Sequence, residues 1–247
     1  MKESPLTLPL IILGIVCLLG APAVMAEVKS DSAIVLGAAN TTSGMVCGSI
    51  IKEAYRRMGV VVEILYLPSA RALALSTQGK TDGEACRILS VAQRSKSLVR
   101  VPVAYLSFHG KAFSIKPSVK VMSPLDLAKY KSGILNGMVY SDNLTRKSER
   151  IKVNSATQLF RMLISEHLNM DLVITTELTG RITIAQEFPG AQIQMAKTNL
   201  VALPVYHYLH VNNKEMAAGI ETILKGMLDN GETYRMKEAF IIEQMKK

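Results

Sequence analysis

Arginines around the end of one predicted strand carry the clearest chemistry in this sequence. Residues 68–94 (PSARALALSTQGKTDGEACRILSVAQR) predict a short helix that begins at its proline, a turn near Gly79, and a strand over 82–88. Arg87 lies in that strand and Arg94 follows it. A guanidinium group binds a carboxylate through two parallel hydrogen bonds, so we expect this block to hold an anionic group.

Alternating strands and helices must position this block. The preceding chain predicts a buried strand over 33–38, an amphipathic helix over 47–58 and a second strand over 60–67. With the helix and strand of 68–94, the order is β-α-β-α-β. This order favours a parallel sheet with helices on its faces.

A second α/β region follows. Its predicted elements are a helix starting at Ser123 and Pro124, strands over 131–135 and 151–153, a helix capped by Ser155, a strand over 171–175 and a helix over 177–186. Extended segments at 99–113 and 199–210 bracket this region. Pro204 interrupts the second one, which argues for a crossing segment and against a central strand. The chain ends in helices interrupted at Gly231.

We therefore predict an α/β protein with two lobes, each a mostly parallel sheet flanked by helices, joined by two crossing strands. Lobe 1 is expected to comprise residues 27–108 and 205–247, and lobe 2 residues 109–204. Open α/β sheets bind ligands at the carboxyl ends of their strands. Two such lobes facing each other make a cleft, and the crossing strands make a hinge.

The first 26 residues have the pattern of a secretory signal peptide. A basic Lys2 precedes an apolar run over 9–19, and small residues lead to Ala26. The run is shorter than the ~20 residues of a spanning helix, which argues against a retained membrane anchor. We expect cleavage after Ala26, a soluble periplasmic product, and a remaining chain of about 220 residues, enough for one large domain or two lobes.

Charge and cysteines narrow the function further. The net charge is +9, but the basic residues are scattered and no basic run is interleaved with aromatic residues, so nucleic-acid binding is not expected. The alternatives are a solvated basic surface and an anionic ligand.

Cys47 and Cys86 form either a disulfide, which an oxidising compartment permits, or two buried free thiols, which the sequence favours slightly. The four histidines lack zinc-like spacing to a cysteine, so no metal or cofactor is expected.

In order and spacing, the chain resembles the bacterial periplasmic solute-binding proteins of family 3, the amino-acid type with the type II periplasmic-binding fold. The matching pieces span nearly all of the chain after the leader: IVLGAANTTSG, IIKEAYRRMG, VEILYLP, RALALSTQGKTDG, AQRSKSLVRVPVAY, SPLDLAKYKSGILNG, QLFRMLISEHLNMDLVIT and LVALPVYHYLH. The resemblance implies a protein that captures a small solute in the interlobe cleft for an ABC-type transporter.

The resemblance also implies a role for Arg94, which stands where the family grips the ligand carboxylate. Other positions depart from the family. Cys86, Arg87 and Leu89 stand where small hydroxyl residues receive the ligand, and Thr176, with Glu177 beside it, stands where an acidic residue holds the ligand ammonium. We therefore expect a carboxylate-bearing or anionic ligand and not the usual zwitterion.

The predicted ligand-binding residues combine both arguments. They are Arg94, Arg87, Arg71, Thr176, Glu177, Tyr66 and Asn40. For Arg87, an ion pair with Glu84 is an equal alternative to ligand contact. Tyrosines on strands are often half-buried packing residues, and His207 and His210 are expected to be structural.

We expect a binding protein and not an enzyme, monomeric, with a small-molecule ligand and a membrane permease or sensor as partners. A second hypothesis is a periplasmic sensor or signalling domain of the same fold. A third is a dehydratase-like enzyme on this scaffold, for which Glu177 and Glu84 are the acid–base candidates.

Overall fold

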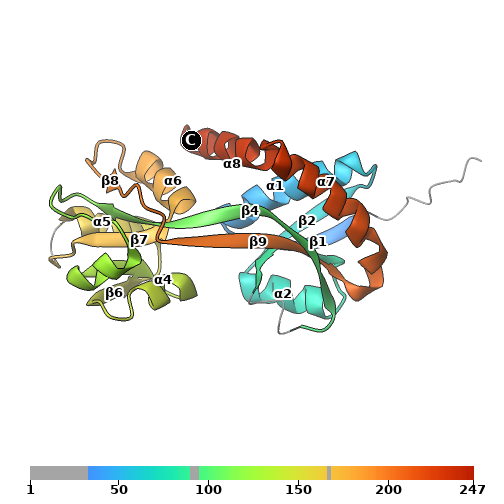
Figure 1. Cartoon of the computed structure of the whole chain (residues 1–247), viewed down its shortest axis with the longest axis horizontal. Coiled ribbons are helices and arrows are strands. Elements are labelled where there is room, and N and C mark those ends of the chain that lie inside the picture. Colours follow the sequence, from blue (N-terminus) through green and yellow to red (C-terminus); the bar gives the residue numbers. More distant parts are fainter. Residues whose placement is uncertain (1–32, 90–94, 166–167) are drawn as a thin grey trace, which may run out of the picture. The chain divides into compact units, whose positions relative to one another are not determined.

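The computed structural model describes residues 33–89, 95–165 and 168–247 (Figure 1). The elements, in chain order, are β1 (Ile34–Ala39), α1 (Thr42–Arg57), β2 (Val62–Leu67), α2 (Ser69–Thr77), β3 (Gly83–Ile88), β4 (Leu98–Ser114), η1 (Pro124–Lys129), β5 (Ser132–Leu135), α4 (Val139–Leu144), β6 (Arg150–Val153), α5 (Ala156–Ser165), β7 (Leu172–Thr176), α6 (Glu177–Glu187), β8 (Gln194–Met195), β9 (Val201–His210), η2 (Val211–Met216), α7 (Ala217–Asp229) and α8 (Glu232–Gln244). Ser32–Lys247 forms one compact unit.

The strands of the described chain form one sheet in the order β2-β1-β3-β9-β4-β7-β5-β6, with β8 paired to β4. In the first lobe, β1 is parallel to β2 and to β3. In the second lobe, β5 is parallel to β6 and to β7. The two-lobed α/β fold, with mostly parallel sheets joined by two crossing strands, is confirmed.

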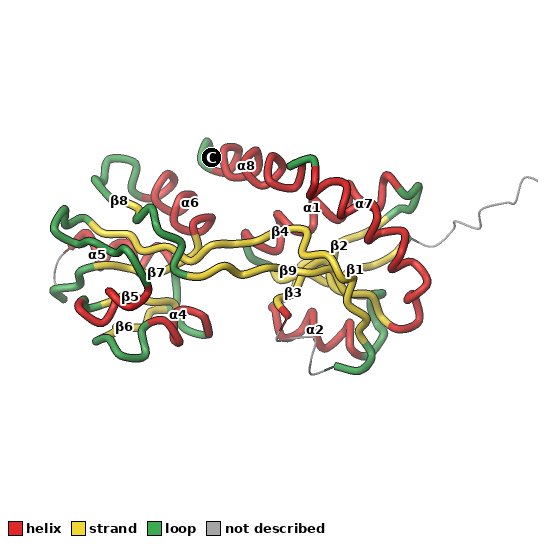
Figure 2. The backbone as a smooth tube through the Cα atoms, in the orientation of Figure 1, coloured by secondary structure: helices red, strands yellow, loops and turns green. Residues whose placement is uncertain are grey.

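The crossing strands are β4 and β9, which run side by side between the two lobes (Figure 2). They pair in antiparallel register from Leu98 opposite His210 to Gly110 opposite Val201. In the first lobe, β9 also pairs with β3 as far as Val205, so this part of β9 is a central strand and not merely a crossing segment. Pro204 lies one residue beyond, where β4 is the paired neighbour, and its missing N–H therefore costs no bond to β3.

The first lobe has helices on both faces of its sheet. Leu36 packs into the main hydrophobic core with α1 and α7. The adjacent Gly37 faces α2, and a Cβ there would lie 3.1 Å from Ser76 Oγ and 3.5 Å from the Ala72 Cβ. Neighbouring strand residues point to opposite faces, so this alternation places α1 and α2 on opposite sides.

The second lobe repeats this arrangement with two smaller cores. Ala112 and Ile174 belong to one core, together with Leu127 of η1. Their strand neighbours Phe113 and Val173 belong to the other, which α5 covers. Because all three hydrophobic cores lie within Ser32–Lys247, this unit holds its own interior.

The helix-start residues of the sequence mark real helix starts, with some differences in helix type. Ser155 accepts a hydrogen bond from Gln158 N at 3.1 Å, as expected for a cap. The predicted helix at Ser123 is a 3₁₀ helix with a capping box, and the short α4 was not predicted.

Among the described residues, every helix is too short or too polar to span a bilayer. The predicted signal peptide lies outside the described residues, and the exact lobe limits stay a prediction.

Candidate functional site

The carboxyl end of β1 leads into the start of α1 through Asn40 and Thr41. Asn40 is exposed, and its backbone N–H donates to Leu67 O at 2.7 Å, which ties the end of β1 to the end of β2. Thr41 Oγ1 accepts from Gly44 N at 3.2 Å and caps α1. A Cβ at Gly44 would lie 1.9 Å from Ala39 O, so only glycine allows this close approach.

Arg71 lies in the first turn of α2, immediately after β2. Its side chain is exposed and forms no ion pair with another described residue. Tyr66, on β2, is half-buried against α1, since a Cβ at Gly48 would lie 2.2 Å from its hydroxyl. Burial raises the pKa of Tyr66. Among the described residues, no acid engages Arg71, whereas Tyr66 is occupied in part by packing.

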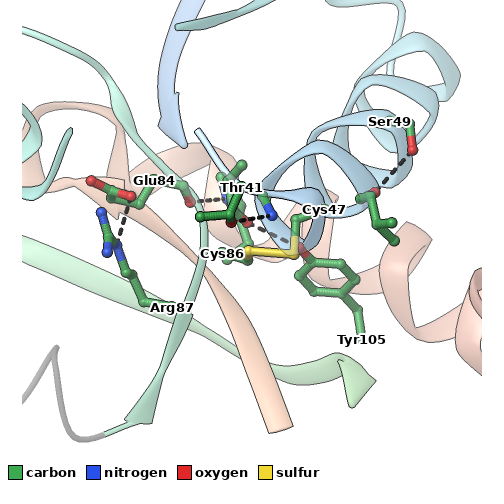
Figure 3. The surroundings of a disulfide bond; sticks show 11 residues. Thr41, Cys47, Ser49, Glu84, Cys86, Arg87 and Tyr105 are labelled. Atoms are coloured by element: carbon green, nitrogen blue, oxygen red, sulfur yellow. Dashed lines mark hydrogen bonds and ion pairs between the residues drawn. A yellow bond between two sulfur atoms is a disulfide. The ribbon is translucent and has the colours of Figure 1, made fainter. Parts of the chain in front are cut away.

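Arg87 forms an ion pair inside the first lobe. Its Nε donates to Glu84 Oε2 at 2.8 Å, and its terminal nitrogens donate to Ser69 Oγ at 2.5 Å and Ser69 O at 2.7 Å (Figure 3 shows the pair with Glu84). Glu84 is fully buried and also accepts from Ser76 Oγ at 3.1 Å. Burial raises the pKa of Glu84, and the Arg87 and Ser76 hydrogen bonds oppose that rise. The structure therefore contains the Arg87–Glu84 ion pair, which was the alternative to ligand contact. Ligand contact by Arg87 stays a prediction.

A disulfide joins Cys47 of α1 to Cys86 of β3, beside Tyr105 (Figure 3). The two Cα atoms are 6.0 Å apart, within the usual bridging range. The slight preference for two free thiols was therefore wrong. Cys86 therefore helps to hold β3 to α1 in the first lobe and offers a ligand no free thiol.

Thr176 and Glu177 lie at the carboxyl end of β7. Thr176 caps α6, where its Oγ1 accepts from Thr179 N at 3.2 Å. Glu177 is partly exposed and lies 3.4 Å from Arg181, which also contacts Glu238 of α8 at 2.8 Å. Thr176 is used locally, and Glu177 is held in an ion-pair chain.

The predicted residues therefore fall at strand ends in both lobes. Asn40 and Tyr66 share the β1–β2 edge, and Arg71 and the Arg87–Ser69 contact lie at the start of α2. Thr176 and Glu177 belong to the second lobe. Arg94 lies outside the described residues.

Sequence reasoning missed Ser69, which accepts from Arg87, and Arg181, which pairs with Glu177. The position of Ser69 directly after Pro68, at a helix start, was the available signal for it. The i,i+4 spacing of Glu177 and Arg181 was the signal for the second pair.

Both acid–base candidates are engaged by arginines. Glu84 is buried and pairs with Arg87, and Glu177 lies 3.4 Å from Arg181, so neither is a free carboxyl group. Within the described ranges, no group of three metal-ligating side chains comes together.

Comparisons with known proteins agree with the fold. No family model matches the chain. An uncharacterized protein from Shewanella oneidensis strain MR-1 is 26% identical to this chain over 196 residues, which is 76% of this chain and 73% of the relative.

Solved structures give a stronger likeness in shape than in sequence. The GluR0 ligand-binding core in complex with L-glutamate has a TM-score of 0.68 at 13% identity, over 86% of this chain and 99% of that one. The amino acid ABC transporter substrate-binding protein AbpA from Streptococcus pneumoniae, bound to L-arginine, has a TM-score of 0.61 at 18% identity, over 87% and 96%. The Bordetella pertussis BvgS VFT2 domain has a TM-score of 0.65 at 12% identity, over 84% and 93%. The chain has the type II periplasmic-binding-protein fold.

Proposed function

We propose that the protein is a periplasmic solute-binding protein that holds a small carboxylate-bearing or anionic ligand between its two lobes and delivers it to an ABC-type transporter. The observation that carries this proposal is Arg71, an exposed arginine with no ion pair among the described residues, in the first turn of α2. A free guanidinium beside a helix start favours an anion through charge and directed N–H groups. Arg94, implicated by the family resemblance, is its expected partner.

Function of this kind needs no bond making. The ligand has to bind the closed arrangement of the lobes better than the open one, and bending of β4 and β9 supplies the hinge. AbpA, an amino acid ABC transporter substrate-binding protein, supports delivery to a permease as the outcome. A cleaved leader would place the protein in the periplasm.

Ligand-dependent thermal stability tests the binding function. The chain from residue 27 onward is screened against monocarboxylates, dicarboxylates, sugar acids and α-amino acids. A ligand at 100 times its Kd stabilises the folded state by about 2.7 kcal/mol. For a chain of this size that raises the melting temperature by roughly 5–10 °C. A flat response to the whole panel would overturn the proposal, and turnover of a binding compound would instead support an enzyme.

Two arginine variants test the site itself. Replacing Arg71 with alanine removes a charge-assisted hydrogen bond worth about 1.5–3 kcal/mol, so affinity should fall roughly 10- to 100-fold. Arg161→Ala is the matched control, because Arg161 is an exposed helical arginine of α5 in the second lobe. Equal affinities for the two variants would show that Arg71 does not contact the ligand.

The BvgS VFT2 likeness supports a second candidate, a sensor domain. Uptake of a labelled ligand by cells that lack the protein separates the two. Lost uptake supports delivery to a transporter. Normal uptake combined with a lost transcriptional response supports sensing.

A further inference from the structure

Positive charge is concentrated in one segment of the second lobe. Residues 116–152 contain eight lysines and arginines and three acidic residues, a surplus of five out of the +9 of the whole chain. The segment follows β4 and contains η1, β5, α4 and most of β6. The scattered basic residues of the sequence therefore gather on one part of the fold.

The acidic side chains of this segment are already neutralised. Asp126 contacts Lys129 at 2.6 Å, Asp142 contacts Lys152 at 2.5 Å, and Glu149 contacts Lys131 at 2.6 Å. The cations left exposed without an ion pair to any described acid are Lys120, Arg146 and Lys147. These three make the segment attractive to an external anionic surface.

Exposed apolar side chains accompany these cations. Leu125 is 85% exposed and Met122 is 77% exposed, the two largest fractions among the large hydrophobic residues that the structure describes. The turn that carries them is fixed, because Met122 N and Ser123 N both donate to Asp126 Oδ2 at 3.0 Å. A rigid turn thus holds Leu125 and Met122 out into solvent.

A groove brings the apolar and basic groups together. It measures about 680 Å³ and is lined by Pro124, Leu125 and Ala128 of η1 together with Arg146, Lys147 and Ser148, which follow α4. Ser148 Oγ donates to Leu127 O at 2.8 Å and ties the segment after α4 to η1. Leu125, Arg146 and Lys147 of this groove, with Lys120 and Met122 from the chain just before η1, are called the basic-apolar face below.

We infer that the basic-apolar face lies against the anionic lipid surface of a membrane. Apolar side chains flanked by cations match the boundary between acyl chains and charged headgroups. An acidic protein surface would attract the cations equally, but it would cover Leu125 and Met122 only if it carried a matching apolar patch, whereas a bilayer offers an apolar layer everywhere beneath its headgroups. Such attachment is reversible, and it concentrates the protein at the membrane independently of any ligand in the cleft.

Vesicle co-sedimentation tests this inference. The sample is the chain from residue 27 onward, because Ser32–Lys247 holds its own cores and the apolar run over 9–19 would bind lipid by itself. We expect binding to phosphatidylglycerol-containing vesicles, little binding to pure phosphatidylcholine vesicles, and loss of binding in 0.5 M salt. Lys147→Gln should weaken binding about fivefold.

Apolar insertion is tested by the double variant Met122→Ser and Leu125→Ser, which should weaken binding several-fold at constant charge. Val61→Ser is the matched control, because Val61 is 66% exposed but lies in the first lobe, and it should leave binding unchanged. Absence of binding to anionic vesicles overturns the inference. An equal loss of binding in the Val61→Ser control also overturns it. So does a double variant that binds vesicles as well as the parent protein while the parent protein binds soluble polyglutamate equally well, because that result would indicate an acidic protein partner.

Discussion

The imidazole of His207 is held between Tyr55 and the main chain of β3. Its Nδ1 lies 2.8 Å from Glu84 O and its Nε2 lies 2.9 Å from the Tyr55 hydroxyl. A carbonyl oxygen only accepts, so Nδ1 carries the proton and Nε2 accepts from Tyr55. The ring is fully buried and therefore neutral.

This neutral histidine predicts a loss of stability in acid. Burial lowers the pKa of His207 from 6.5 to about 4. The unfolded chain takes up a proton near pH 6.5 and the folded chain does not, so the contribution is complete above pH 6.5 and is lost as the pH falls toward 4. The loss is about 1.4 kcal/mol per pH unit and about 3 kcal/mol in all. Urea unfolding at pH 7.5, 6 and 5 measures it.

His207→Gln is the control for that experiment, since its amide can both donate to Glu84 O and accept from Tyr55 but does not titrate. We expect the variant to have a flatter dependence of unfolding free energy on pH. Identical slopes for the two proteins would contradict the assignment.

Breaking the disulfide should weaken the first lobe strongly. The bridge spans a sequence separation of 39 residues, for which chain entropy gives about 4 kcal/mol of stabilisation. Replacing both cysteines with alanine should lower the melting temperature by roughly 10 °C. A thiol titration of the chain from residue 27, after denaturation without reductant, should find no free thiol. Two titratable thiols would refute the bridge.

Two ion pairs with the same i,i+3 spacing should differ greatly in importance. Arg87 is 10% exposed and Glu84 is fully buried, whereas Arg56 is 71% exposed in its pair with Glu53. Arg87→Ala leaves a buried carboxylate without its partner and should cost about 3–5 kcal/mol. Arg56→Ala should cost less than about 1 kcal/mol. Comparable losses in denaturant unfolding would show that Glu84 is solvated.

Replacing each of two helical glycines with alanine should change the stability of the protein in opposite directions. A Cβ at Gly180 of α6 would lie 2.1 Å from the Phe113 ring, so Gly180→Ala should destabilise the second lobe by about 1–3 kcal/mol. A Cβ at Gly226 of α7 meets nothing within 4 Å, so Gly226→Ala should stabilise by up to about 1 kcal/mol. Thermal melts of both variants decide the matter, and a neutral Gly180→Ala would mean that α6 moves away from β4 at no cost.

Local patterns in the sequence predicted most of the architecture. Hydrophobic periodicity predicted α1, and the helix-start residues Ser123 and Ser155 marked where η1 and α5 begin. The short α4 escaped because six residues are too few for a helical period to show. Pro204 argued against a central strand, which was correct at that residue. The same interpretation was wrong for residues 205–209 of β9, which pair with β3.

The surroundings of the site were harder to predict, because they depend on burial and on contacts between residues far apart in the sequence. Tyr55 and His207 are 152 positions apart, and no local pattern joins them. The spacing of Cys47 and Cys86 likewise contains no information about their distance in space. Arg87 had two plausible partners in the sequence, and only the burial of Glu84 shows which one it holds.

The place of β9 in the sheet also fixes the order in which the molecule can be completed during synthesis. The parallel strands β5, β6 and β7 come from one continuous stretch and can pair as soon as that stretch has emerged. In contrast, β3 waits for β9, with Gly83 opposite Leu209, and until then β3 presents an open edge to other chains. The first lobe to be made is therefore the last to be finished.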